Sequence, residues 1–175
     1  LLAELHGKPL VRVVAEQVLA SKVSSVTVVT GYQAAEVERA LRGLNVTFVY
    51  NPDFPTGLAS SLKAGIGVVP KEAGGALICL GDMPLIDAHI LDRLIAAFAP
   101  DRGMLIAVPV SGGARGNPVL WSRRFFGELM SLEGDVGGRN LITRHTEVVA
   151  EVAVEDQGAF LDIDTPQALA AMQRG

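Results

Sequence analysis

Strand-like apolar runs alternate with amphipathic helical stretches from Pro9 to Val110, and this alternation restricts the possible folds more than any other feature of the chain. Val23–Thr30 and Ala76–Leu80 are nearly continuous apolar runs, typical of strands buried on both faces. Gln33–Leu41 and Leu58–Val68 carry apolar residues at helical spacing, and short Gly, Pro or Asn signals separate the segments. The alternation predicts an α/β fold in which helices flank a mostly parallel central sheet.

The rhythm changes after Asp101, where the predicted helices become shorter and the pattern less regular. We interpret the second half as a small β-containing elaboration of the same domain, placed over the ligand edge of the sheet, so that residues 1–175 form a single domain. The predicted strands here are Met104–Pro109, Asn117–Trp121, Val148–Val154 and Phe160–Ile163, and the predicted helices are Phe125–Met130, Arg139–His145 and a closing helix from Thr165 to Ala171.

Charge and cysteine content narrow the function classes. The formal net charge of -4 argues against broad nucleic-acid binding, which normally needs a basic stripe. Cys79 is the single cysteine, which excludes an internal disulfide and a multi-thiolate zinc site. The sequence shows neither a signal peptide nor a long apolar run, so we expect a cytoplasmic protein without a membrane partner.

Asp82 lies in the first of three loops that carry candidate chemistry. In open α/β sheets, ligands bind beyond the carboxyl ends of the strands, and Leu80–Pro84 leaves the sheet at such an end. Gly81 leaves room for a phosphate or a metal ion, and Mg²⁺ favours one or two carboxylates plus substrate phosphates. Asp82 is therefore a candidate metal ligand. A plain turn or helix cap, with Pro84 in a first helical turn, explains the same residues.

The second loop runs from Asn51 to Gly57 and leads into a predicted helix with Ser60 and Ser61 near its start. Free backbone N–H groups, hydroxyl donors and the positive end of the helix dipole together suit a phosphate or a base edge. Ordinary capping of the helix by Ser60 or Thr56 is the alternative interpretation.

The third feature is the stretch Leu161–Pro166, which contains two aspartates. If this stretch is extended, Asp162 and Asp164 point the same way and could complete a metal site with Asp82. Capping by Asp164 of a helix that has Pro166 in its first turn is the alternative.

Two glycine-flanked stretches resemble ligand loops and ordinary turns in equal measure. Arg115 lies within Gly112–Pro118, which suits an anionic substrate or the tip of a hairpin. Asp135 and Arg139 belong to Gly134–Arg139, where Asp135 can cap the helix that Arg139 enters.

Other reactive side chains favour structural roles. His6, His89 and His145 have no spacing for metal or triad chemistry, so we expect surface or packing positions. Cys79 lies inside an apolar strand and is interpreted as a small buried hydrophobe. A GxSxG elbow and a Walker lysine motif are both missing, which disfavours a hydrolase and a P-loop NTPase.

Six motifs occur in an order that resembles one family. The motifs are GKPL (Gly7–Leu10), NPDFPTGLASSL (Asn51–Leu62), LGDMPL (Leu80–Leu85), RGNPVL (Arg115–Leu120), GDVGGR (Gly134–Arg139) and DIDTPQAL (Asp162–Leu169). With these motifs the chain resembles the MobA-like nucleotidyltransferases, and within them the molybdenum cofactor cytidylyltransferase branch, over nearly its whole length.

This resemblance implies a Rossmann-like nucleotidyltransferase fold that binds CTP or GTP with Mg²⁺ over the sheet edge. It implies that Asp82 holds the metal together with Asp164, with Asp162 as the alternative. By the same resemblance, the nucleotide side comprises Asn51, Gly57, Ser60, Ser61, Gly81 and Asp82, and the acceptor side comprises Arg115, Asn117, Asp135 and Arg139.

The implied reaction moves CMP from CTP to a phosphorylated acceptor, molybdopterin, and releases pyrophosphate. Transfer from GTP, a methylerythritol phosphate or sugar phosphate acceptor, and a non-catalytic nucleotide- or pterin-binding chaperone of a molybdoenzyme are the alternatives.

One family motif has no counterpart in the printed sequence. The family opens with a strand and a glycine-rich LAAGxSxRMG loop that ends in a lysine and grips the triphosphate, and Leu1 and Leu2 resemble the residues that follow this lysine. Lys8 matches the GKPL lysine and not the catalytic one. We expect the loop to be encoded upstream, or the chain to be inactive without it.

Overall fold

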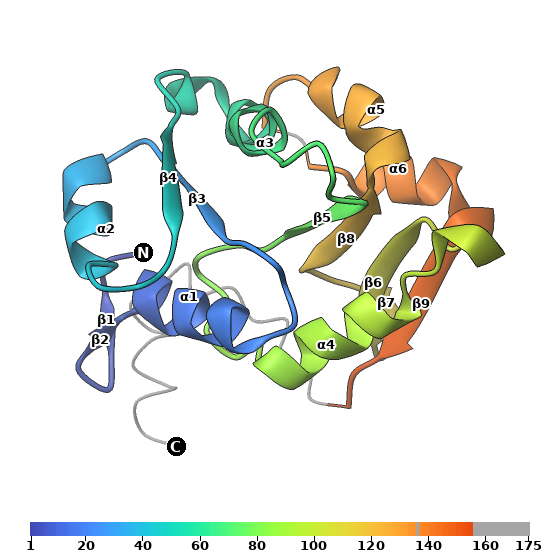
Figure 1. The fold of residues 1–175 in the computed structure, drawn as a ribbon, viewed down its shortest axis with the longest axis horizontal. Helices are drawn as coiled ribbons and strands as arrows, with labels where there is room; N and C mark the ends of the chain where they lie inside the picture. The colour runs from blue at the N-terminus through green and yellow to red at the C-terminus, as the bar shows by residue number, and fades with distance from the viewer. Residues whose placement is uncertain (136, 156–175) are drawn as a thin grey trace.

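The computed structural model describes residues 1–135 and 137–155 (Figure 1), so the candidates Asp162 and Asp164 and the last predicted strand and helix lie outside the described residues. The described helices are α1 (Leu10–Ala20), α2 (Ala34–Ala40), α3 (Leu58–Ile66), α4 (Ala88–Ala97), α5 (Phe126–Met130) and α6 (Arg139–Arg144). The described strands are β1 (Glu4–Leu5), β2 (Lys8–Pro9), β3 (Thr27–Thr30), β4 (Thr47–Tyr50), β5 (Gly75–Ile78), β6 (Ile106–Ser111), β7 (Ala114–Arg115), β8 (Val119–Ser122) and β9 (Val149–Ala153).

The largest described sheet has five strands in the order β5-β8-β6-β7, with β9 paired to β6. β8 runs antiparallel to both β5 and β6, whereas β9 runs parallel to β6. Three of the strands, β5, β6 and β9, therefore run in one direction. The α/β class with a mostly parallel sheet is confirmed, and the strands of the second half join β5 in this one sheet.

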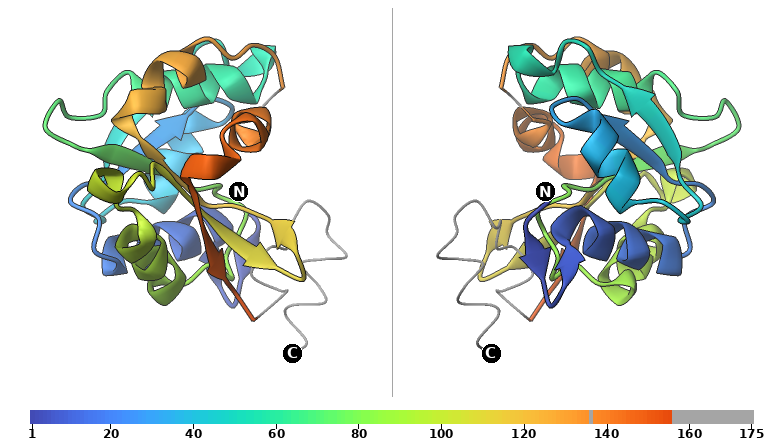
Figure 2. Two further views of the ribbon diagram at one scale, coloured as in Figure 1. Left: turned by 90° about the vertical axis from the view of Figure 1, so that its right-hand side faces the viewer. Right: turned by 90° about the vertical axis from the view of Figure 1, so that its left-hand side faces the viewer.

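Alternate residues of this sheet face two separate cores. Ile106, Val108 and Trp121 pack with α3, α5 and α6 on one face. Ala107 and Leu120 pack with α4 on the other face, where α1 contributes Val18. This switch at every residue is the period of two expected of a strand. Figure 2 shows the same division, with α1 and α4 on one side of the sheet and α3 and α5 on the other.

β3 and β4 form a separate parallel pair, and here the prediction for Val23–Thr30 was wrong in two respects. The strand begins only at Thr27, and its central valines are half-buried rather than enclosed on both faces. The carbonyls of Val26 and Thr30 accept hydrogen bonds from Thr47 in β4 and from Asn51 just after it. Successive residues of a strand direct their backbone groups to opposite edges, so those of Val29 point away from β4. Among the described residues, no strand pairs with that second edge of β3, and this explains the partial exposure.

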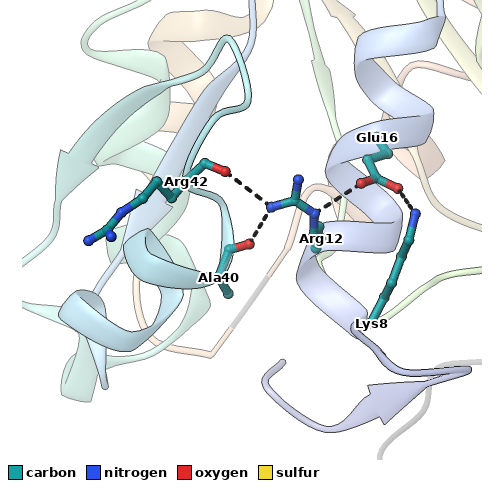
Figure 3. Close-up of polar contacts among 5 residues, drawn as sticks. All are labelled: Lys8, Arg12, Glu16, Ala40 and Arg42. Carbon is teal, nitrogen blue, oxygen red and sulfur yellow. Dashed lines mark hydrogen bonds and ion pairs between the residues drawn. The ribbon is translucent and has the colours of Figure 1, made fainter.

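α1 is tied to α2 by a buried apolar contact and by one arginine. Val11 and Ala15 pack against Val37 and Leu41. Arg12 donates from Nη1 to the backbone carbonyls of residues 40 and 42, at 2.8 and 3.2 Å, where α2 ends (Figure 3). α1 begins at Leu10, directly after Pro9, which is the last residue of β2.

None of the helices in the described part of the chain has the length and apolar character needed to cross a bilayer.

Candidate functional site

Asn51 organises the loop between β4 and α3. Its side chain is only 3% exposed, and its amide Nδ2 donates to Ser60 Oγ at 2.9 Å and to Ser61 Oγ at 3.1 Å. Its Oδ1 accepts from the backbone N–H of Asp53 at 3.0 Å. The backbone N–H of Asn51 extends the β3–β4 pairing by donating to Thr30. Asn51 therefore fixes both serines relative to the end of the sheet.

The two serine hydroxyls have different amounts of freedom. Ser60 Oγ lies 2.9 Å from the carbonyl oxygen of Asp53 and 2.8 Å from that of Gly57, so its proton has acceptors within the loop. Ser61 Oγ accepts from Asn51, and no acceptor for its proton is found in residues 1–135 and 137–155. Ser61 is thus the hydroxyl that remains able to donate to a ligand.

Gly57 permits a close backbone approach between distant parts of the chain. Its φ is +114°, a conformation that side-chain-bearing residues rarely adopt. A Cβ at this position would lie 2.5 Å from the carbonyl carbon of Gly134 and 2.7 Å from the amide nitrogen of Asp135. Glycine at position 57 is consequently needed for contact with the stretch Gly134–Arg139.

Asp135 caps a different helix from the predicted one. Its Oδ1 accepts from the N–H of Leu58 at 3.3 Å, and the carbonyl of Gly134 accepts from the N–H of Ala59 at 3.1 Å. Both donors belong to the first turn of α3, whereas α6 has Gly138 at its N-cap and no side-chain cap. The expected capping of α6 by Asp135 was therefore wrong, because the tertiary approach of Gly134 to Gly57 directs the carboxylate to α3.

Asp82 carries an unsatisfied oxygen in the loop after β5, a strand that ends at Ile78 and not at Leu80 as predicted. Its Oδ1 is buried, and no hydrogen-bond donor to it is found among the described residues. A buried carboxylate oxygen without a donor costs free energy unless a ligand or metal satisfies it. Within the described ranges no three His, Cys, Asp or Glu side chains gather to hold a metal, so the other ligands would have to come from substrate or from elsewhere in the chain.

Gly81, next to Asp82, is covered by a side chain in this structure. A Cβ at position 81 would lie 2.9 Å from Cδ2 of Leu1, which is the flexible end of its side chain. The space expected for a phosphate or a metal ion is therefore occupied by Leu1, and a ligand at Gly81 requires that side chain to move.

The acceptor-side candidates are spread over the second half. Arg115, in β7, forms a 2.7 Å ion pair between its Nε and Oε1 of Glu151 on β9. Asn117 is half-buried just before β8, and Arg139 is exposed at the first residue of α6. Asp135 is the member of this group that contacts the nucleotide-side residues. Among the described residues, no hydrogen bond or ion pair links Asp82 or Arg115 to the Asn51–Ser61 cluster.

The three histidines take surface or packing positions as predicted, whereas Cys79 lies just beyond β5, which ends at Ile78, and is half-buried. Burial raises the pKa of Cys79 to about 12, and the thiol lines a small apolar cavity with Val14 and Met83. His6 and His89 are exposed. His145 packs edge-on against Phe125, with ring centroids 5.0 Å apart.

The comparisons with known proteins agree with this geometry. A profile described as the MobA-like NTP transferase domain matches residues 1–149. The chain belongs to the MobA-like NTP transferase family. It is 31% identical over 144 residues to the molybdenum cofactor cytidylyltransferase of Escherichia coli (strain K12), an alignment that covers 82% of this chain and 71% of that protein.

Solved structures of similar fold cover almost the whole chain. Rv0371c from Mycobacterium tuberculosis H37Rv superposes with a TM-score of 0.87 and 25% identity, covering 99% of this chain and 88% of that one. A manganese complex of Rv0371C has a TM-score of 0.85 and 24% identity, covering 99% of this chain and 90% of that one. These likenesses support the Rossmann-like nucleotidyltransferase fold.

Proposed function

We propose that this member of the MobA-like NTP transferase family transfers CMP from CTP to molybdopterin and releases pyrophosphate. The observation that carries the choice of substrates is the 31% identity to the molybdenum cofactor cytidylyltransferase over 82% of the chain. The proposal includes a cytoplasmic location, folding of residues 1–175 as one domain, and delivery of the product to a molybdoenzyme.

The residues fit a hard divalent cation, which we propose to be Mg²⁺. Asp82 would supply one carboxylate through its Oδ1, for which the described part of the chain offers no donor. Asp164, or alternatively Asp162, would supply a second carboxylate, and both lie outside the described residues. When bound, the cation neutralises charge on the phosphates of the nucleotide.

Catalysis in this scheme rests on positioning and charge stabilisation. A terminal phosphate oxygen of the acceptor attacks the α-phosphorus of CTP, the bond from that phosphorus to the bridging oxygen breaks, and pyrophosphate leaves with the electron pair. The hydroxyl of Ser61 would donate a hydrogen bond to the base or ribose, and Asn51 would hold this hydroxyl in place. Arg139 would attract the acceptor phosphate, as would Arg115 after separation from Glu151, with Asn117 beside it.

The decisive test compares CTP with GTP as the substrate of the full-length protein. The protein is incubated with molybdopterin, Mg²⁺ and one of the two nucleotides, and pyrophosphate release and nucleotide affinity are measured. We expect kcat/KM for CTP to exceed that for GTP by about tenfold or more, a difference of about 1.4 kcal/mol. A preference for GTP would overturn the cytidylyl assignment, and tight CTP binding without turnover would favour the non-catalytic binding protein.

A further inference from the structure

The N-terminus of α3 has no cap from its own loop. Gly57 occupies the N-cap position and has no side chain with which to accept a hydrogen bond. Thr56 Oγ1 donates to the carbonyl of Asp53 at 2.7 Å, and Ser60 Oγ donates to carbonyls of the same loop. The first backbone N–H groups of a helix need acceptors, and here the local hydroxyls are directed elsewhere.

Asp135 and Gly134 supply two of those acceptors, from 77 and 75 positions away in the sequence. The Asp135 carboxylate faces the N–H of Leu58, and the Gly134 carbonyl faces the N–H of Ala59. A carboxylate is favourable here for a second reason, because its negative charge lies at the positive end of the helix dipole. The first two N–H groups of α3 are thus satisfied by groups from outside its own loop, whereas the N–H of Ser60 donates to the carbonyl of Gly57 at 3.2 Å.

The segment that carries Asp135 is anchored on its other side as well. Gly138 lies so close to the Trp121 ring that a Cβ there would overlap it, and Trp121 is 2% exposed in the core of the sheet. Leu58 also approaches Gly137, with its Cδ2 3.7 Å from where a Cβ would lie. These anchors connect the sheet core, the Asp135 carboxylate and the start of α3 through packed groups.

We propose that Asp135 is a positioning residue for the nucleotide and not an acceptor ligand. It acts through the N–H of Leu58 to hold Gly57 and the start of α3 in place, and thereby also Ser61, the fourth residue of that helix. This inference rests on the proposed function for its readout, since Ser61 is the donor offered to the nucleotide. It is an alternative to the acceptor-side role that the family resemblance implies for Asp135, and it is supported by the hydrogen bond from Leu58 to the Asp135 carboxylate.

Three variants of the full-length protein test this role. Asp135→Ala removes the acceptor, Asp135→Asn keeps an acceptor oxygen but removes the charge, and Asp87→Ala removes a matched cap from α4, where Asp87 Oδ1 accepts from Ile90 at 2.8 Å. We expect D135A to raise the Kd and KM for CTP by about fivefold, the loss expected for one helix cap, with kcat changed less than about twofold. D135N should stay within about twofold of the wild type, because asparagine caps as well as aspartate does.

The control and a structural readout make the result decisive. D87A should lower Tm about as much as D135A while leaving CTP affinity unchanged. Hydrogen exchange at the amides of Leu58 and Ala59 should accelerate in D135A alone, and this is measurable without any nucleotide. Unchanged exchange there would overturn the positioning role. A wild type that binds no CTP, with exchange still accelerated in D135A, would instead overturn the proposed function. A kcat loss of about 100-fold in both D135N and D135A would make Asp135 a catalytic residue and overturn the inference.

Discussion

Asn51 and Asp82 both lie in loops that follow strands, and they take opposite roles. The amide of Asn51 is fully engaged by Ser60, Ser61 and Asp53, so it builds the site and has little left to offer a ligand. The buried Oδ1 of Asp82 has no donor within the described residues. A buried acceptor left unpaired destabilises the folded protein by about 1–3 kcal/mol. A ligand or metal ion bound to Asp82 Oδ1 would remove this cost, so the unpaired oxygen is compatible with a binding role.

Replacing Asp82 by Asn should remove activity and keep the fold. The amide loses the negative charge that a cation and the developing phosphate charge require, so we expect pyrophosphate release to fall about 100-fold or more. Tm should stay within a few degrees of the wild type, because within residues 1–135 and 137–155 the carboxylate makes no hydrogen bond that the substitution breaks. Asp101→Asn, at an exposed turn, is the matched control and should be fully active. Full turnover by D82N would remove Asp82 from the mechanism.

At the level of elements, α1 and α2 show how polar contacts supplement a small apolar interface. Arg12 and Lys8 both contact Glu16, but only Arg12 reaches across to α2 (Figure 3). The hydrogen bond from Lys8 holds the pKa of Glu16 below its ordinary value, with a smaller contribution from Arg12. Arg12 also places a positive charge at the C-terminal end of α2, where the helix dipole favours one.

Removing Arg12 should therefore destabilise the protein more than removing Lys8. We expect Arg12→Ala to lower the free energy of unfolding by about 1–2 kcal/mol, since it abolishes hydrogen bonds from a charged donor to two carbonyls. Lys8→Ala should cost less than about 1 kcal/mol, because its ion pair is exposed to solvent. Urea unfolding of both variants gives these values. Equal losses would show that the contact with α2 contributes nothing.

For the molecule as a whole, burial of Cys79 couples stability to alkaline pH. The thiol lies among apolar side chains of α1 and of the loop after β5, and its pKa is raised from 9.0 to about 12. The unfolded chain then releases the thiol proton at lower pH than the folded chain does. Folding stability attributable to this group is complete below pH 9 and declines as pH rises between 9 and about 12.

This coupling is measurable by urea unfolding of the wild type and of Cys79→Ala from pH 8 to pH 11. The wild type should lose stability faster than the variant above pH 9, with an additional slope of up to about 1.4 kcal/mol per pH unit. The variant serves as the control for the titration of lysines and tyrosines, because it contains the same lysines and tyrosines as the wild type. Parallel curves for the two proteins would mean that the thiol is accessible in the folded state.

The periodicity of apolar residues in the sequence determined most of the helices and strands. The order of the motifs determined the family. The continuous apolar run Ile106–Val108 fits a strand with two buried faces, and the predicted start of a helix at Leu58 is where α3 begins. Such patterns are local, since a side chain's position on a strand or helix follows from its spacing alone. The excess strand predicted at Val23 shows the limit, because enclosure depends on pairing partners that spacing does not specify.

The tertiary structure alone decided which polar groups meet. The donor for Asp135 is Leu58, 77 positions away, and no local pattern distinguishes that pairing from a cap on α6. Likewise, Arg115 pairs with Glu151 because β6 lies between β7 and β9 in the sheet. Hydrogen bonds and ion pairs act over about 3–4 Å, so their partners are fixed only once the sheet register and the backbone contact of Gly57 with Gly134 have placed the loops.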